Sequence, residues 1–176
     1  FMYLLFLGFL TTRLEDDSGW TSVDASMAFS VMGVAMIFGG PLLTTLAQRF
    51  GVRFMLSLAF GLWPLFTVIV LSGIALPVWF GCMGIGFLFS SLPSLITLYV
   101  VENTTAKDYG ACFAAATLVF GVAQTISPPI GGWIADMTGS FIMVFLLSAI
   151  TSLIGLAAVL RLPSTTGLLK KEQDSK

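Results

Sequence analysis

The sequence predicts an all-α membrane protein: a six-helix bundle made of two inverted repeats of three helices, whose first helix is truncated. Two observations support this prediction. The chain is 57% hydrophobic and only 10% charged, and its apolar residues form uncharged runs long enough to cross a bilayer, which takes about 20 residues. One stretch of sequence also recurs at an offset of 88 residues, from Gly33 to Gly121. Such runs would expose too much apolar surface in a soluble protein, so soluble fold classes are excluded.

The apolar runs give the expected helices in chain order. Phe1–Thr12 is apolar but covers only about 18 Å as a helix, and we expect it to be the end of a span whose first part is missing. Five complete spans follow, at Ala25–Gln48, Phe54–Leu71, Val78–Val101, Tyr109–Ala135 and Met137–Leu160. Ser72, Gly73 and Pro77 supply the turn between the second and third of these. From Phe141 onward the last span is almost wholly aliphatic and aromatic, which suits a lipid-facing helix.

The repeat aligns Gly33–Met55 with Gly121–Met143. Identical residues meet at Gly33 and Gly121, Val34 and Val122, Ala35 and Ala123, Pro41 and Pro129, Ala47 and Ala135, Gly51 and Gly139, and Met55 and Met143. A unit of three spans crosses the membrane an odd number of times, so its second copy enters the membrane from the opposite side. Many secondary transporters are built from such inverted repeats. The alternative is that two unrelated membrane helices share a common helix–loop–helix pattern.

Basic residues predict the orientation. When the spans are counted from Arg13, all other cations fall on one face of the membrane: Arg49, Arg53, Lys107, Arg161, Lys170, Lys171 and Lys176. We therefore expect a multi-pass protein of the plasma membrane, of the bacterial inner-membrane type, with a cytoplasmic C-terminus. The membrane bundle would occupy residues 1–163, and residues 164–176 would form a disordered cytoplasmic tail.

Two segments resemble the major facilitator superfamily. Leu46–Arg53 resembles its cytoplasmic signature loop, although Thr44 replaces the usual first Gly and Gln48 the usual Asp. Phe120–Phe141 resembles the penultimate helix and the outer turn that follows it, and its amino-acid sequence is similar to that of the bacterial YbfB/YjiJ-like transporters. The resemblance implies a major-facilitator-type bundle in which this chain is the C-terminal half, helices seven to twelve. The partner would then be a missing N-terminal six-helix half of the same protein.

The loop motif has a physical reading of its own. Gly51 permits a tight turn where a side chain would clash. Arg49 and Arg53 can hold carbonyl ends or carboxylates of neighbouring helices, and Glu102 is the nearest acid in the predicted topology. The alternative is that both arginines only follow the excess of positive charge on the cytoplasmic face.

Polar residues inside the spans are the candidates for a substrate cavity, because leaving them in lipid is costly. No charged residue lies in the middle of a complete span, so the sequence shows no intramembrane proton relay. The cavity candidates share faces of two spans and are Ser90, Ser94, Thr97, Thr117 and Gln124. Gln124 is expected to hydrogen-bond a substrate, because it is the most polar side chain near mid-membrane and its repeat counterpart is the apolar Met36. For the serines, helix packing through small residues is favoured over a cavity role, and for Gln124 a hydrogen bond between helices is the alternative.

Two prolines and two glycines near the outer end of the fourth complete span are candidates for a helix bend. They are Pro128, Pro129, Gly131 and Gly132. Proline removes a helical hydrogen bond and disfavours a straight helix. The sequence leaves open whether the bend is a moving hinge or a static kink.

These features favour a secondary active transporter that moves a small solute by alternating access. The chain has no histidine, its acids lie outside the middle of the complete spans, and Cys82 and Cys112 lack metal-ligand spacing, so we expect neither an enzyme, a metal site nor a cofactor. No phosphate-binding glycine loop is present, which argues against ATP hydrolysis. Expected partners are a small-molecule substrate and the lipid bilayer, with no nucleic acid. The alternative is a non-transporting membrane assembly or a receptor-like protein.

Overall fold

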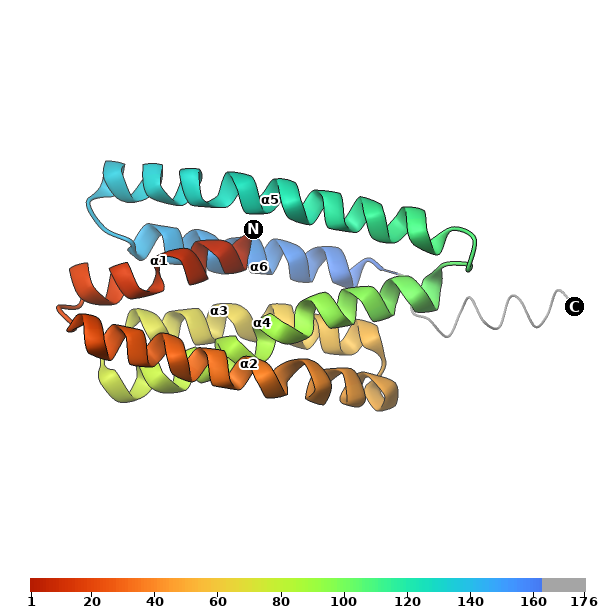
Figure 1. The fold of residues 1–176 in the computed structure, drawn as a ribbon, viewed down its shortest axis with the longest axis horizontal. Helices are drawn as coiled ribbons and strands as arrows, with labels where there is room; N and C mark the ends of the chain where they lie inside the picture. The colour runs from red at the N-terminus through yellow and green to blue at the C-terminus, as the bar shows by residue number, and fades with distance from the viewer. Residues whose placement is uncertain (163–176) are drawn as a thin grey trace, which may run out of the picture.

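The computed structural model describes residues 1–162, and in this range the chain forms six α-helices that run in alternating directions along one axis (Figure 1). They are α1 (Met2–Asp16), α2 (Ser22–Phe50), α3 (Val52–Leu71), α4 (Ala75–Asn103), α5 (Tyr109–Thr138) and α6 (Ile142–Leu160). Helices α2 to α6 are long and apolar enough to cross a membrane, which confirms the all-α membrane fold. Helix α1 has only 15 residues. The predicted tail at 164–176 lies outside the described residues.

The turns that end α2 and α5 are equivalent under the 88-residue offset. Gly51 follows α2 with φ of +87°, and Gly139 follows α5 with φ of +67°. Each donates its backbone N–H to an alanine carbonyl at 2.8 Å, Ala47 in one turn and Ala135 in the other. Glycine occupies such positions because a side chain strains backbone with positive φ. The two turns lie at opposite ends of the bundle in Figure 1, the arrangement that an inverted repeat requires.

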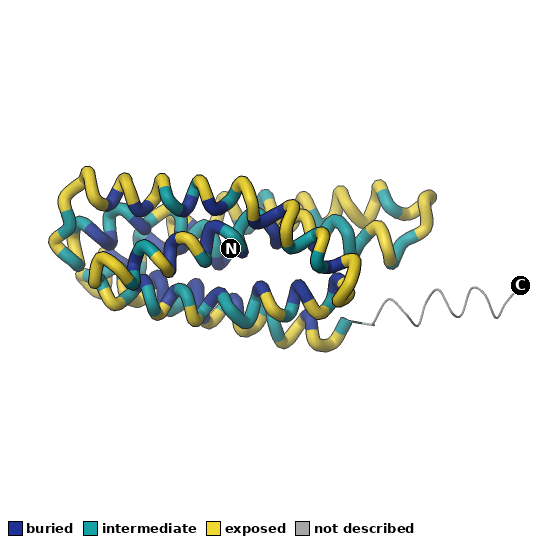
Figure 2. Tube along the Cα trace, turned by 90° about the horizontal axis from the view of Figure 1, so that it is seen from below, coloured by how far each residue is buried: buried dark blue, intermediate teal, exposed yellow. Residues whose placement is uncertain are grey.

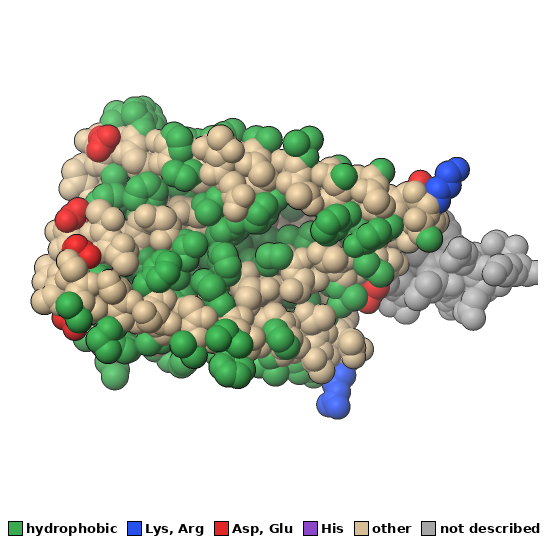
Figure 3. Space-filling view, viewed as in Figure 1, with side chains coloured by type: hydrophobic (Ala, Val, Ile, Leu, Met, Phe, Trp, Pro, Cys, Tyr) green, Lys and Arg blue, Asp and Glu red, His purple; other side chains and the backbone are tan. Residues whose placement is uncertain are grey.

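Charged side chains divide between the two ends of the bundle (Figure 3). We call one the basic end; it carries Arg49, Arg53, Lys107 and Arg161, together with the acids Glu102 and Asp108. We call the other the acidic end; it carries Glu15, Asp16, Asp17, Asp24 and Asp136. Arg13 is the one cation of the acidic end among the described residues, and it is buried there. The sides of the membrane that these ends face stay predictions.

Side chains from the last turn of α1 and the connection to α2 tie the acidic end together. Arg13 donates to the carbonyl of Leu71, at the end of α3, at 2.7 Å. Trp20 donates its indole N–H to the Gly73 carbonyl at 2.9 Å. Asp17 accepts from the backbone N–H of Phe141, just before α6, at 2.9 Å. The three connections at this end are therefore joined by side-chain hydrogen bonds, which we call the acidic-end ties.

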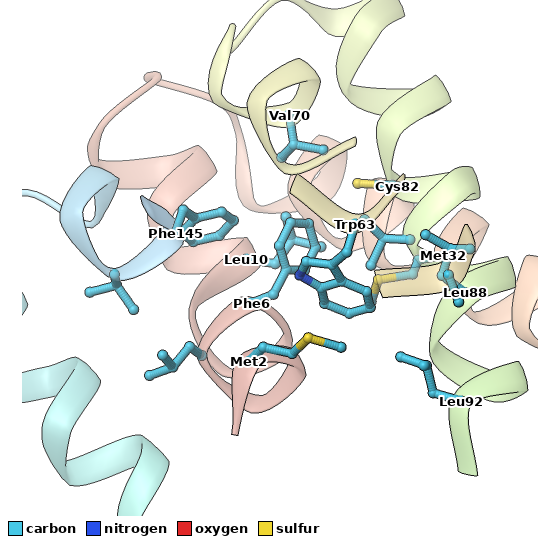
Figure 4. Packing of buried hydrophobic residues seen from close by; sticks show 14 of the residues in the cluster. Met2, Phe6, Leu10, Met32, Trp63, Val70, Cys82, Leu88, Leu92 and Phe145 are labelled. Atoms are coloured by element: carbon cyan, nitrogen blue, oxygen red, sulfur yellow. The ribbon is translucent and has the colours of Figure 1, made fainter. Parts of the chain in front are cut away.

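The core lies where α1, α3 and α6 meet (Figure 4). Phe6 of α1 packs against Trp63 of α3 and Phe145 of α6, with ring centroids 5.9 and 4.8 Å apart, and all three side chains are fully buried. Trp63 donates its indole N–H to the Ser148 hydroxyl at 3.0 Å, which donates to the Met2 carbonyl at 2.6 Å. Helix α6 thus gives one face to the core and leaves Ile150 and Ile154 exposed on the others.

Helices α2 and α4 approach each other most closely at glycines. A Cβ added at Gly39 would collide with the Phe87 carbonyl of α4, and one at Gly86 with the Met32 carbonyl of α2. Small residues allow membrane helices to pack at such short range. The contact makes α2 and α4 a closely packed pair along the bundle.

Helix α5 is attached to the bundle mainly by its half near the acidic end. Its buried residues, Ser127, Gly131 and Ala135, all lie in that half, and a Cβ at Gly131 would collide with the Phe9 ring of α1. In Figure 2 exposed residues follow the helix faces that point out of the bundle. The half of α5 near the basic end has no buried residue and borders the cavity described next.

Candidate functional site

A cavity of about 450 Å³ lies between α4 and α5, beside the first residues of α1. Ile96 and Val100 of α4 form one wall and Phe113 and Phe120 of α5 the other, so most of the lining is apolar. A green recess between these helices is visible near the middle of the face shown in Figure 3. The volume is in the range of pockets that hold small molecules, about 300–1,000 Å³.

The polar groups of the cavity wall are hydroxyls. Thr97, Thr117 and Thr151 line the cavity, and each donates its hydroxyl to the carbonyl four residues earlier on its own helix, at 2.9 Å. Tyr3 is the remaining hydroxyl in the lining. Among the described residues, no Asp, Glu, Lys or Arg side chain lines the cavity. The site can therefore hold an apolar solute with few polar groups.

The cavity brings together two of the five predicted candidates. Thr97 and Thr117 face it from opposite walls, on α4 and α5. Ser90 instead accepts a hydrogen bond from the Gly40 backbone N–H at 2.9 Å. Ser94 lies one turn further along α4, where a Cβ at Gly40 would come within 3.6 Å of its hydroxyl. Both serines thus belong to the contact between α2 and α4 and do not line the cavity.

Gln124 reaches the cavity through a second side chain. Its amide nitrogen donates to the Tyr3 hydroxyl oxygen at 3.2 Å, and Tyr3 lines the cavity. The Tyr3 ring packs edge-on against Phe89 and is stacked with Phe120, with centroids 4.6 and 5.6 Å apart. Sequence reasoning missed Tyr3, although it is the one residue with a hydrogen-bonding side chain in the apolar stretch from Phe1 to Leu10.

The loop motif lies at the basic end, away from the cavity wall. Arg53 donates from its guanidinium to the Leu160 carbonyl, at the end of α6. Arg49 is exposed, and Gly51 forms the turn between α2 and α3. Glu102 lies in the last turn of α4 at the same end. Arg53 thus holds the carbonyl end of a neighbouring helix, and a role for either arginine in transport stays a prediction.

A family model described as the Major Facilitator Superfamily matches residues 1–175. The chain belongs to this superfamily. It is similar to human "Monocarboxylate transporter 6", with 28% identity over 162 residues. The match covers 88% of this chain and 32% of the human protein, so the chain spans about a third of that relative's length. Membership of the superfamily, together with five apolar helices, makes the chain a multi-pass membrane protein of the transporter class and argues against an enzyme.

Helix α5 stays α-helical at the residues where a bend is predicted. Helix α5 continues from Tyr109 to Thr138 and includes Pro128 and Pro129. Gly131 is required by the contact with Phe9, whereas a Cβ at Gly132 would meet open space. The bending of α5 during a transport cycle stays a prediction.

Proposed function

We propose that this chain is the C-terminal half of a secondary active transporter, which moves a small solute across the plasma membrane by alternating access. The observation that supports it most is a largely apolar cavity inside the bundle of a Major Facilitator Superfamily chain. A six-helix N-terminal half would complete the transporter and the other side of the solute path.

The proposed orientation places the basic end in the cytoplasm. Four described cations at that end, against the buried Arg13 at the other, fit the excess of positive charge on cytoplasmic loops. The C-terminus would then be cytoplasmic and the protein an inner-membrane protein of the bacterial YbfB/YjiJ-like branch. The assignment to this branch is based only on the amino-acid sequence of Phe120–Phe141.

The cavity favours a neutral or amphipathic solute. Its lining offers hydroxyls and aromatic rings and, among the described residues, no charged side chain. The name of the human relative says that it transports monocarboxylates, and a small organic acid with an apolar body suits these walls. The N-terminal half would then supply the partner of the carboxylate charge, because a buried charge needs a partner.

The test is uptake of radiolabelled benzoate into proteoliposomes that contain the whole protein. Ala116 lines the cavity, so Ala116→Phe should fill it and lower uptake at least several-fold. Ala157 is exposed on α6 and does not line the cavity, so Ala157→Phe makes the same change in size and should leave uptake intact. If the whole protein inserts normally but transports neither benzoate nor a panel of neutral aromatic solutes, the non-transporting alternative is favoured instead.

A further inference from the structure

The hydrogen bond between Gln124 and Tyr3 has a fixed direction. The amide nitrogen of Gln124 can only donate, so the Tyr3 oxygen is the acceptor at 3.2 Å. A tyrosine hydroxyl also carries one hydrogen of its own. Among the described residues the Tyr3 hydroxyl donates no hydrogen bond, and Tyr3 lies in the cavity wall. The hydroxyl hydrogen of Tyr3 is therefore left for a group inside the cavity.

The threonines of the cavity cannot play the same part. The hydroxyls of Thr97, Thr117 and Thr151 already donate to the backbone carbonyls of Pro93, Phe113 and Leu147. What they still offer to a solute is an acceptor oxygen. Tyr3 is thus the one side chain in the described lining whose hydrogen remains free to donate.

Tyr3 is also held in a fixed orientation. Its ring lies between Phe89 of α4 and Phe120 of α5, and Gln124 holds its oxygen from α5. Aromatic pairs with this geometry restrict the position of the ring. A donor held in place beforehand loses little conformational freedom when a solute binds.

We propose that Tyr3, oriented by Gln124, is the hydrogen-bond donor that recognises an acceptor oxygen on an otherwise apolar, ring-containing solute. The inference rests on the proposed function and names the solute class of the same cavity. A carbonyl or carboxylate oxygen would accept from Tyr3, while the apolar body would lie against Phe113 and Phe120. Gln124 then acts through Tyr3, as a positioning residue that does not itself touch the solute.

The experiment uses two probes that differ in one group. Acetophenone carries a carbonyl oxygen where α-methylstyrene carries a CH₂ group of similar size. Binding of each tritiated probe is measured on the whole protein in nanodiscs. Partition of a probe into lipid is the same for every variant, so variants are compared with one another. Tyr3→Phe keeps the ring contacts and removes only the hydroxyl.

Tyr3→Phe should weaken acetophenone binding roughly five-fold, the effect of one neutral hydrogen bond, and leave α-methylstyrene binding unchanged. Gln124→Met should weaken acetophenone binding by a smaller factor. The double variant should bind acetophenone no more weakly than Tyr3→Phe, because both residues act through one hydroxyl. Thr125→Val is the matched control: it removes a hydroxyl of the same helix that donates to the Gly121 carbonyl and does not line the cavity, so it should leave acetophenone binding unchanged.

Three outcomes would overturn the inference. Equal loss of both probes in Tyr3→Phe would make Tyr3 a packing residue. Unchanged acetophenone binding in Tyr3→Phe would exclude Tyr3 as the donor. Binding of neither probe to a wild-type protein that takes up benzoate would refute this recognition and leave the proposed function standing. Absence of benzoate uptake alongside normal binding of the probes would count against the proposed function and not against the role of Tyr3.

Discussion

Gly51 and Gly139 end two helices with positive φ at opposite ends of the bundle. Each follows a helix of nearly equal length, 29 residues for α2 and 30 for α5, and each donates its N–H back to an alanine carbonyl at 2.8 Å. Identity at these positions therefore corresponds to the same positive φ and the same backbone hydrogen bond, although ψ is 142° at Gly51 and 16° at Gly139. In a membrane, two such turns face different compartments, and this consequence can be measured directly.

Cysteines placed at equivalent positions of the two repeats should be labelled from opposite sides. Gln48 and Asp136 are 88 residues apart and both are exposed. A background in which the exposed Cys112 is replaced by serine leaves only the buried Cys82. An impermeant maleimide added outside intact cells should then label one of Gln48→Cys and Asp136→Cys, and the other only after lysis. Labelling of both from outside would contradict the inverted repeat.

The contact between α2 and α4 should not tolerate a methyl group at Gly39. Its Cβ would collide with the Phe87 carbonyl, which belongs to a helix backbone and cannot move aside locally. Gly39→Ala should lower the free energy of unfolding by about 1–3 kcal/mol, seen as a lower unfolding temperature in detergent. Gly33→Ala is the control on the same helix, because its Cβ meets open space, and it should leave stability unchanged or slightly higher. Equal effects of the two changes would mean that close packing at Gly39 does not matter.

The buried hydroxyl of Ser148 should contribute to the free energy of unfolding, because it accepts the hydrogen bond of the buried Trp63 indole N–H. Ser148→Ala leaves the buried indole N–H of Trp63 without its acceptor, which should cost about 1–3 kcal/mol of unfolding free energy. In Trp63→Phe the donor is already gone, so adding Ser148→Ala should cost less there. A double-mutant cycle on unfolding free energies measures this coupling. Strictly additive effects would show that the bond contributes nothing.

The two arginines of the loop motif should differ. Arg53 holds the Leu160 carbonyl at the end of α6, one of the carbonyls that the helix itself leaves unpaired. Arg53→Ala should lower the unfolding free energy by about 1 kcal/mol, and Arg53→Lys should retain part of it. Arg49 makes no side-chain hydrogen bond among the described residues, so Arg49→Ala should have little effect on stability. A loss of uptake in Arg53→Ala larger than its loss of stability would support a role in transport.

Hydropathy and glycine chemistry were enough to predict the helices and their turns. Four of the five complete spans appear with one or both ends extended by two or three residues, while the last begins at Ile142 instead of Met137, which belongs to α5. Gly51, Gly73 and Gly139 all adopt positive φ. These features are local: the length of an apolar run and the need for a residue without Cβ can be read at each position. Pro77, predicted in a turn, lies in the first turn of α4, where its missing N–H costs no helical bond.

The sequence did not predict which neighbour each helix face contacts. Ser90 and Thr97 lie on one side of α4, as their spacing predicts, yet Ser90 meets α2 and Thr97 meets the cavity. Periodicity identifies a face, but the crossing of α2 and α4 decides which part of that face is covered. Tyr3 gave little signal because the stretch around it is apolar, and its partner Gln124 lies 121 residues away.

The acidic-end ties have a consequence for the order in which the chain is made. Arg13 and Asp17 leave the ribosome before their partners Leu71 and Phe141, which come 58 and 124 residues later. Arg13 gains its carbonyl when α3 is complete, and Asp17 gains its N–H only when α6 begins. A nascent chain stopped before Ser140 thus holds a carboxylate at the membrane boundary with no last helix to receive it. Synthesis of the first turn of α6 is therefore the event that completes the acidic-end ties.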